Sequence, residues 1–285
     1  MSSSPYSTPE RPGRGRILHR SPSRRVAFTG MLDNILDSVR RRLPDLAARE
    51  DRLRDAAGEM PPARDFTGAL AAPGLSVIAE FKRASPSKGV INAGMEPAER
   101  AAAFAEGGAS AMSVLTEPDH FMGADDDLRA ARAATSLPAL RKDFTLDTAH
   151  VWEARAMGAD AILLIVAILD DPMLARLLRT AEDAGLAALV EVHTREEAAR
   201  ALVAGARVVG VNNRDLRTFS VDLATAEEIS PLLEGVDVRV AESGVKGPED
   251  AARLRAAGYD AVLVGEYLSR SVDPAQAISG LRGVT

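Results

Sequence analysis

One short unit recurs along the chain and restricts its fold more than any other feature. In each copy an Ala- and charge-rich helical segment ends in a glycine, and an apolar run begins two or three positions later. A glycine just past a helix supplies the left-handed conformation that ends it, and a continuous apolar run predicts a strand buried on both faces, as in a parallel sheet. The glycines of these units are Gly108, Gly158, Gly185, Gly205, Gly235 and Gly258.

Two further apolar runs, at residues 76–82 and 139–142, bring the predicted strands from six to eight. Strands that alternate with helices predict a parallel sheet. Eight such units within about 210 residues predict a closed (β/α)8 barrel, the TIM barrel. An open doubly wound sheet is the alternative. No Gly-x-Gly-x-x-Gly follows the first strand, which counts against the dinucleotide-binding form of that fold.

The chain is expected to have three parts. Residues 1–30 are rich in Ser, Pro, Gly and Arg and are expected to be a disordered leader; a true start at Met31 or, alternatively, an organelle transit peptide would account for them. Apolar residues at helical spacing predict a helix from Met31 to about Gly58, and a proline-rich linker follows. Residues 31–74 are therefore expected to pack on a barrel formed by residues 75–285.

Composition excludes several classes of protein. The formal charge is 35 − 41 = −6, and without residues 1–30, which hold six Arg and one Glu, the rest carries 29 − 40 = −11. Such an acidic body argues against a nucleic-acid binder. The longest apolar run, residues 161–169, is about half of what a membrane-spanning helix needs. The absence of cysteine excludes disulfides and thiolate sites. We expect a cytoplasmic protein without membrane or nucleic-acid partners.

Polar and charged residues stand at the end of almost every predicted strand. The C-terminal ends of the strands of a (β/α)8 barrel form one rim, where active sites lie, so these residues are expected to share one site. Glu80 and Lys82, on one side of an apolar strand, suit an interior only as a paired or functional set. The strand ends carry Glu80, Lys82, Glu117, Lys142, Asp143, Glu191, Asn212, Arg214, Glu242, Ser243, Gly244, Gly265 and Glu266.

The chemistry of these side chains predicts acid–base catalysis. Lys82 and Lys142 are candidates for a phosphate ligand and a general acid, because a lysine among carboxylates stays charged. Glu80 and Glu191 are candidate bases or stabilisers of a cation.

Other residues on the rim point to the class of substrate. Ser243, Gly244 and Gly265 lie in the loops where such barrels bind phosphate, and Asn212 and Arg214 could hold a second anion, such as a carboxylate. Apolar residues could line an aromatic pocket, namely Pro86, Phe121, Phe144, Leu163, Ile165 and Leu216. This pattern favours an aromatic sugar phosphate with a carboxylate, and neither metal nor cofactor. Three histidines lack ligand spacing and are expected at the surface, namely His120, His150 and His193.

The segment at residues 78–87, Ile-Ala-Glu-Phe-Lys-Arg-Ala-Ser-Pro-Ser, resembles the signature of the indole-3-glycerol phosphate synthases of tryptophan biosynthesis. Other motifs of that family are resembled, in the same order, at residues 113–117, 142–144, 189–192, 210–216 and 241–244. The likeness runs from about residue 31 to the end. It implies an extra N-terminal helix that covers the mouth of the barrel.

The resemblance also implies a reaction. The substrate would be 1-(2-carboxyphenylamino)-1-deoxy-D-ribulose 5-phosphate, which closes its ring onto the sugar ketone and loses carbon dioxide and water. By this resemblance Lys142 is the general acid, Glu191 and Glu80 are the acid–base pair, and Lys82 binds beside the carboxylate and phosphate. Substrate contacts are expected from Ser85, Pro86, Phe121, Phe144, Leu163, Asn212, Arg214, Leu216 and Glu242. Phosphate contacts are expected from Lys82, Ser243, Gly244 and Gly265. Glu266 is left out, because a carboxylate there would repel phosphate.

Three other functions stay open at this point. Phosphoribosylanthranilate isomerase and the α subunit of tryptophan synthase share the phosphate loops, although the first relies on a cysteine, which this chain lacks. A catalytically silent barrel could bind a sugar phosphate. A metal-dependent aldolase would need clusters of His or carboxylates. Contact with other enzymes of the tryptophan pathway is a further expectation.

Overall fold

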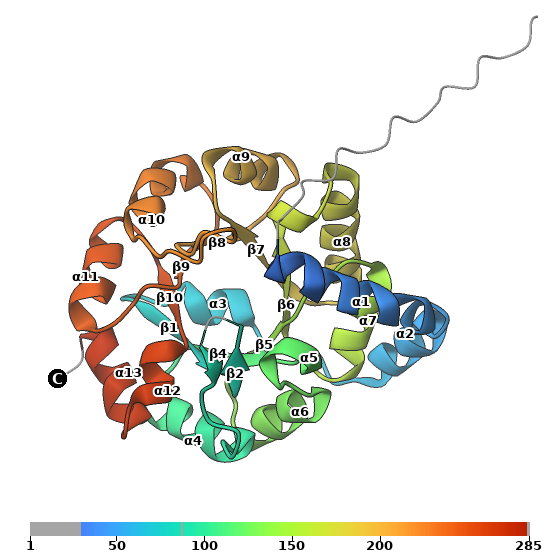
Figure 1. Cartoon of the computed structure of the whole chain (residues 1–285), viewed down its shortest axis with the longest axis horizontal. Helices are drawn as coiled ribbons and strands as arrows, with labels where there is room; N and C mark the ends of the chain where they lie inside the picture. The colour runs from blue at the N-terminus through green and yellow to red at the C-terminus, as the bar shows by residue number, and fades with distance from the viewer. Residues whose placement is uncertain (1–29, 87, 284–285) are drawn as a thin grey trace, which may run out of the picture.

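The computed structural model describes residues 30–86 and 88–283, and its strands close into a barrel. In this part of the chain eight parallel strands form a ring in the order β1-β10-β9-β8-β7-β6-β5-β4, and β4 pairs back onto β1 (Figure 1). Their bounds are β1 Ser76–Phe81, β4 Ala111–Leu115, β5 Ala139–Lys142, β6 Ala161–Ile165, β7 Ala187–Val192, β8 Val208–Asn212, β9 Val238–Glu242 and β10 Ala261–Val264. The predicted (β/α)8 barrel is confirmed, and the open sheet is excluded.

Helices surround this ring (Figure 1). The longer ones are α4 Pro97–Glu106, α6 Asp125–Ala134, α7 Thr148–Ala156, α8 Asp171–Asp183, α9 Arg195–Val203, α10 Ala224–Ile229, α11 Pro248–Ala256 and α13 Pro274–Arg282. Shorter elements are α5 Pro118–Phe121, α12 Glu266–Arg270, the 3-10 turns at Val166–Ile168 and Ser230–Leu233, and a small hairpin of β2 Ala84–Ser85 with β3 Gly89–Val90. No helix among the described residues is long and apolar enough to cross a membrane.

The glycines of the repeated unit do what the sequence predicts. All of them have a positive φ, for example 92° at Gly158 and 88° at Gly205. Each thus ends its helix in the left-handed conformation, from which the chain passes directly into the next strand.

Apolar side chains form two layers, because successive residues of a strand point to opposite faces. On β1, Ile78 points into the barrel, where it packs in the same cluster as Leu140, Leu189 and Val240. Its neighbour Val77 belongs to the layer between the strands and the surrounding helices. The inner layer supports the site, and the outer layer holds the helices to the ring.

The segment before the barrel differs from its prediction in two respects. The single helix expected from Met31 to Gly58 is two helices, α1 Met31–Ala47 and α2 Glu50–Glu59. The expected linker contains a third helix, α3 Phe66–Leu70, whose Phe66 and Leu70 are fully buried in the cluster inside the barrel. Residues 1–29 of the expected leader lie outside the described residues. The division of the chain at residues 31–74 and 75–285 stays a prediction.

Candidate active site

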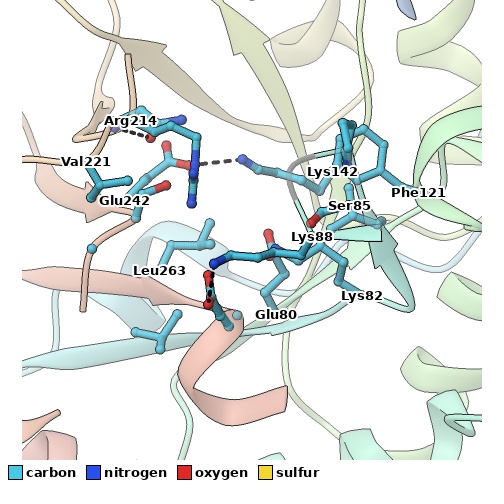
Figure 2. Close-up of a pocket in the computed structure, with 18 of the residues that line it drawn as sticks. Glu80, Lys82, Ser85, Lys88, Phe121, Lys142, Arg214, Val221, Glu242 and Leu263 are labelled. Atoms are coloured by element: carbon cyan, nitrogen blue, oxygen red, sulfur yellow. Dashed lines mark hydrogen bonds and ion pairs between the residues drawn. The ribbon is translucent and has the colours of Figure 1, made fainter. Parts of the chain in front are cut away.

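A cavity of about 710 Å³ opens at the C-terminal ends of the strands (Figure 2). Every residue of the predicted site lines it, so residues far apart in the sequence of the barrel come together at one end of it. These residues are Glu80, Lys82, Ser85, Pro86, Phe121, Lys142, Phe144, Leu163, Glu191, Asn212, Arg214, Leu216, Glu242, Ser243, Gly244 and Gly265. Their chemical roles stay predictions. Glu117, another residue at a strand end, instead caps α5 by accepting hydrogen bonds from the backbone of Asp119 and His120.

Four charged side chains form one inward-facing layer at this end of the barrel. Glu80, Lys142, Glu191 and Glu242 come from β1, β5, β7 and β9, which alternate around the ring; such barrels build each interior layer from four residues on alternate strands. The Nζ atom of Lys142 lies 3.0 Å from Oε2 of Glu242 and 3.2 Å from Oε2 of Glu191. The layer beneath, two residues earlier on each strand, is apolar and consists of Ile78, Leu140, Leu189 and Val240.

Lys82 and the loops after β9 and β10 border another part of the cavity. Lys82 Nζ donates a hydrogen bond to Oε1 of Glu80. A Cβ atom at Gly265 would lie 2.3 Å from that same oxygen, so a side chain at this position would displace the pair. Ser243 has a φ of 62° although it is not a glycine, and Gly244 follows with a φ of 93°. Such strained backbone is concentrated at ligand-binding sites.

Arg214 and an aromatic pair border the remaining sides. The backbone N–H of Arg214 donates to Oδ1 of Asn212, and its guanidinium donates to the carbonyl oxygen of Phe219, at 3.1 and 3.3 Å. The rings of Phe121 and Phe144 have their centroids 6.3 Å apart. The cavity thus combines cations with an aromatic wall.

All four lysines of the chain line this one cavity. They are Lys82, Lys88, Lys142 and Lys246.

Comparisons with known proteins agree with this geometry. Residues 32–281 match the family model described as indole-3-glycerol phosphate synthase. The indole-3-glycerol phosphate synthase of Mycolicibacterium smegmatis is 51% identical over 256 residues, which cover 88% of this chain and 93% of that protein. The corresponding protein of Rhodococcus jostii is 52% identical, with 88% and 94% covered.

The chain belongs to the indole-3-glycerol phosphate synthase family. The interpretation from its motifs, including the carbon–carbon lyase activity that the family implies, is therefore confirmed. Solved structures show the fold alone: a thiamine phosphate pyrophosphorylase from Pyrococcus furiosus matches with a TM-score of 0.57 at 18% identity, covering 77% of this chain and 97% of that one. A 3-hexulose-6-phosphate synthase matches with the same TM-score and identity, covering 74% and 99%.

Within the charged layer of this cavity, burial and neighbouring charges shift the pKa values of Lys142, Glu191 and Glu242. Burial opposes the charge of Lys142, but Glu242, Glu191 and Glu80 outweigh burial and raise its pKa. Burial also raises the pKa of Glu191, but Lys142 and His193 outweigh it, so the net direction is downward. Burial raises the pKa of Glu242 to about 7, with Lys142 opposing and Glu191 adding to the rise. At neutral pH, Lys142 is thus an ammonium and Glu191 a carboxylate, while Glu242 is close to its midpoint.

Some residues that line the cavity were not predicted from the sequence. Leu32 and Ile35 come from α1, so this helix forms part of the wall. Phe219 and Val221 come from the loop after β8. The resemblance implied that this helix covers the mouth of the barrel, but the sequence did not show which of its residues reach the cavity.

Glu266, which is left out of the predicted site, also lines the cavity. Its Oε1 atom lies 3.5 Å from Nζ of Lys88 and 2.9 Å from a guanidinium nitrogen of Arg270. Its charge is therefore matched by two cations. Figure 2 shows Lys88 extended across the mouth from the β2–β3 hairpin.

The expectation that the histidines lie at the surface is wrong. His150 is 7% exposed, and the side chain of His193 is 9% exposed. His120 is half-buried, with Nε2 3.4 Å from Oγ of Ser38. The period of two along a strand could have indicated that His193 shares a side with Glu191.

Among the described residues, no group of three or more His, Cys, Asp or Glu side chains is placed to hold a metal ion. That the reaction needs no metal and no cofactor stays a prediction.

Proposed function

We propose that this cavity converts 1-(2-carboxyphenylamino)-1-deoxy-D-ribulose 5-phosphate to indole-3-glycerol phosphate, carbon dioxide and water, as a step of tryptophan biosynthesis. Family membership supports the reaction. One observation supports its location: Nζ of Lys142 lies between the carboxylates of Glu191 and Glu242 at the inner end of the cavity. Cations on the rim and an aromatic wall suit a doubly anionic aromatic substrate.

Lys142 is the general acid in this proposal. Because its pKa is raised, its amine is an ammonium, which gives up a proton and does not attack the substrate ketone as a nucleophile. The ring carbon that bears the carboxylate bonds to the ketone carbon, and the carbonyl oxygen takes the proton from Nζ. Carbon dioxide then leaves, and its bonding electrons restore the aromatic ring.

Glu191 and Glu80 form the acid–base pair for the loss of water. One of them donates a proton to the departing hydroxyl, and the other removes a proton from the neighbouring sugar carbon, so that the C–O bond breaks as the C–C double bond forms. Because its pKa is lowered, Glu191 is ionised and is able to serve as the base of the pair. Decarboxylation consumes one proton overall, which solvent returns to Lys142.

The remaining residues bind and orient the substrate. Lys82, Ser243, Gly244 and Gly265 hold the phosphate, and Asn212, Arg214 and Ser85 orient the carboxylate and the sugar. The apolar walls that hold the aromatic ring are Pro86, Phe121, Phe144, Leu163 and Leu216, and Glu242 contacts the substrate beside Lys142.

The activity is tested by adding the substrate to the purified chain with EDTA present and recording indole fluorescence. We expect a time-dependent rise that EDTA does not abolish. Binding without a rise would instead support a silent sugar-phosphate barrel, and neither binding nor a rise would contradict the proposal. A rise that EDTA abolishes would contradict the metal-free part of it.

Two variants of Lys142 test the role of that residue. We expect Lys142→Ala to lower kcat by about 10²- to 10⁴-fold, the usual contribution of a general acid, while substrate still binds by calorimetry. Lys142→Arg keeps the charge but does not release a proton near neutral pH, so it should bind substrate and remain as slow as Lys142→Ala. Turnover within a few-fold of the unmodified chain in either variant would rule out the general-acid role.

We also propose a cytoplasmic location, with which the absence of cysteine agrees. We further propose no nucleic-acid partner, which the acidic body of the chain supports. Contact with other enzymes of tryptophan biosynthesis is part of the same proposal.

A further inference from the structure

Each carboxylate oxygen of Glu191 has its own basic neighbour. Oε2 lies 3.2 Å from Nζ of Lys142, and Oε1 lies 3.3 Å from Nε2 of His193. Glu191 is only 2% exposed. The Nε2 atom of His193 is also buried, and within the described part of the chain it has no aligned hydrogen-bond partner. The base of the proposed reaction is thus held between a lysine and a histidine.

The position of His193 follows from the end of β7 and the start of α9. Glu191 and His193 are two residues apart, so both side chains leave the strand on the same side. Thr194 is the N-cap of α9, and its Oγ1 accepts a hydrogen bond from the backbone N–H of Glu197 at 3.2 Å. The sequence Thr-x-x-Glu is typical of a capping box, in which the glutamate reaches back to the N-cap amide.

In this chain the glutamate reaches one residue further back. Oε2 of Glu197 accepts the backbone N–H of His193 at 2.7 Å and lies 3.2 Å from Nδ1 of its ring. A carboxylate at Nδ1 fixes the proton on that nitrogen and directs Nε2 toward Glu191. His193 is not among the described residues that line the cavity. Any effect of His193 on the substrate must therefore pass through Glu191.

The charges around this pair come from several strands and one helix. Burial opposes protonation of His193, but the hydrogen bond to Glu197 and the charges of Glu191, Glu197 and Glu242 outweigh it and raise its pKa. Glu191 in turn faces Lys142 on β5, Asn212 on β8 and Glu242 on β9.

We propose that His193, oriented by Glu197, is a positioning residue that holds the carboxylate of Glu191 and sets the pH at which that carboxylate accepts a proton. The proposal rests on the proposed function, in which Glu191 is the base. The carboxylates around His193 favour its protonated ring, which directs Nε2–H toward Oε1 of Glu191. When Glu191 takes the proton from the sugar carbon, that proton stays on the carboxyl group, and Nε2–H remains directed at Oε1. The proton on Nδ1 remains on the ring and is hydrogen-bonded to Glu197, so no proton leaves the site through the histidine.

The test compares four variants by kcat, KM, the pH profile of kcat and the melting temperature. We expect His193→Ala to lower kcat by about tenfold with KM within twofold of the unmodified chain. His193→Gln should recover part of this kcat, because its amide can donate to Glu191. The acid limb of the kcat profile of His193→Gln should lie about one pH unit higher than that of the unmodified chain. The reason is that a neutral amide does not lower the pKa of Glu191.

The two glutamates at the start of α9 give a matched pair. Glu197→Gln should shift the pH profile in the same direction as His193→Gln, whereas Glu196→Gln should leave it unchanged, because the Glu196 side chain is exposed to solvent.

Three results would overturn the proposal. One is that the unmodified chain turns over substrate and the His193→Ala variant has the same kcat and the same pH profile. Another is a loss in which kcat, KM and melting temperature change together and His193→Gln rescues nothing, which indicates a purely structural role. An unmodified chain that binds substrate but does not turn it over would remove the proposed function and this proposal with it.

Discussion

At the scale of single residues, the neighbours of Glu242 determine how a buried acid is accommodated inside the barrel. Oε1 of Glu242 lies 2.2 Å from where a Cβ atom at Gly210 would be, so β8 carries a glycine opposite this buried acid. Within the described residues, Oε1 has no hydrogen-bond partner. A buried oxygen without a partner is unfavourable for a carboxylate and less so for a carboxylic acid. This environment explains why burial is the largest cause of the raised pKa of Glu242.

The pH dependence of stability should reveal the raised pKa of Glu242. The pKa of Glu242 is raised from 4.5 to about 7, so the unfolded chain loses a proton that the native state keeps between these values. The contribution of Glu242 to stability is therefore fully present below pH 4.5 and is lost as the pH rises through 7. Glu242→Gln cannot ionise, so we expect it to become more stable relative to the unmodified chain between pH 5 and 8, by about 3 kcal/mol at most.

Thermal unfolding of both chains at the two pH values measures this difference. A gap in melting temperature that is the same at pH 5 and pH 8 would contradict the raised pKa.

The sequence shows which residues face the cavity more readily than how they pair. Lys142 and Glu242 both end apolar strands, and the period of two places each on the inner face. Their contact joins residues 100 positions apart and depends on the closure of the ring. The pairing of His193 with Glu197 is local, and the Thr-x-x-Glu pattern beside it could have indicated it.

At the scale of elements, the segment before β1 contributes to the barrel at both ends. Leu32 and Ile35 of α1 line the cavity at the mouth. Helix α3 packs Phe66 and Leu70 against the barrel interior, and it appears within the ring in Figure 1. The sequence did not predict α3, because five residues with a single apolar pair at helical spacing are too few to show a repeating period. Only the assembled barrel provides the surface that they cover.

Removal of the Phe66 side chain tests how much α3 contributes. We expect Phe66→Ala to destabilise the fold by about 3–5 kcal/mol, the usual cost of emptying a buried aromatic site, because Phe66 is 1% exposed. Val203→Ala is the control, since Val203 is 91% exposed and should change stability by less than about 0.5 kcal/mol. Denaturant unfolding measures both, and equal midpoints would show that α3 is dispensable.

At the scale of the whole molecule, the first and last parts of the barrel meet. Strand β1 pairs with β10, with Val77 opposite Val262. Helix α13 packs against α4, where the Oγ atom of Ser279 donates to the carbonyl oxygen of Gly107. A Cβ atom at Gly107 would lie 2.6 Å from the backbone oxygen of Ala275. The ring therefore closes through a contact between backbones that leaves no room for a methyl group.

Two glycine substitutions separate this contact from helix propensity. We expect Gly107→Ala to destabilise the fold by about 1–3 kcal/mol, because backbone of α13 must move. Gly58→Ala, in α2, meets nothing within 4 Å and should stabilise the fold by about 0.5–1 kcal/mol. Melting temperatures that change in the same direction would contradict the role assigned to Gly107.

The placement of the lysines gives the molecule an uneven covalent reactivity. Apart from the chain's amino terminus, reagents that acylate amines find their targets only around one cavity. The side chain of Lys88 is 46% exposed, whereas those of Lys82 and Lys142 are 17% and 14% exposed and are held by carboxylates. Lys246 is exposed as well. An acyl group would therefore attach first to Lys88 or Lys246, both at the rim of the cavity. Immobilisation through amines would orient the molecule with its catalytic end toward the support and close the entrance to substrate.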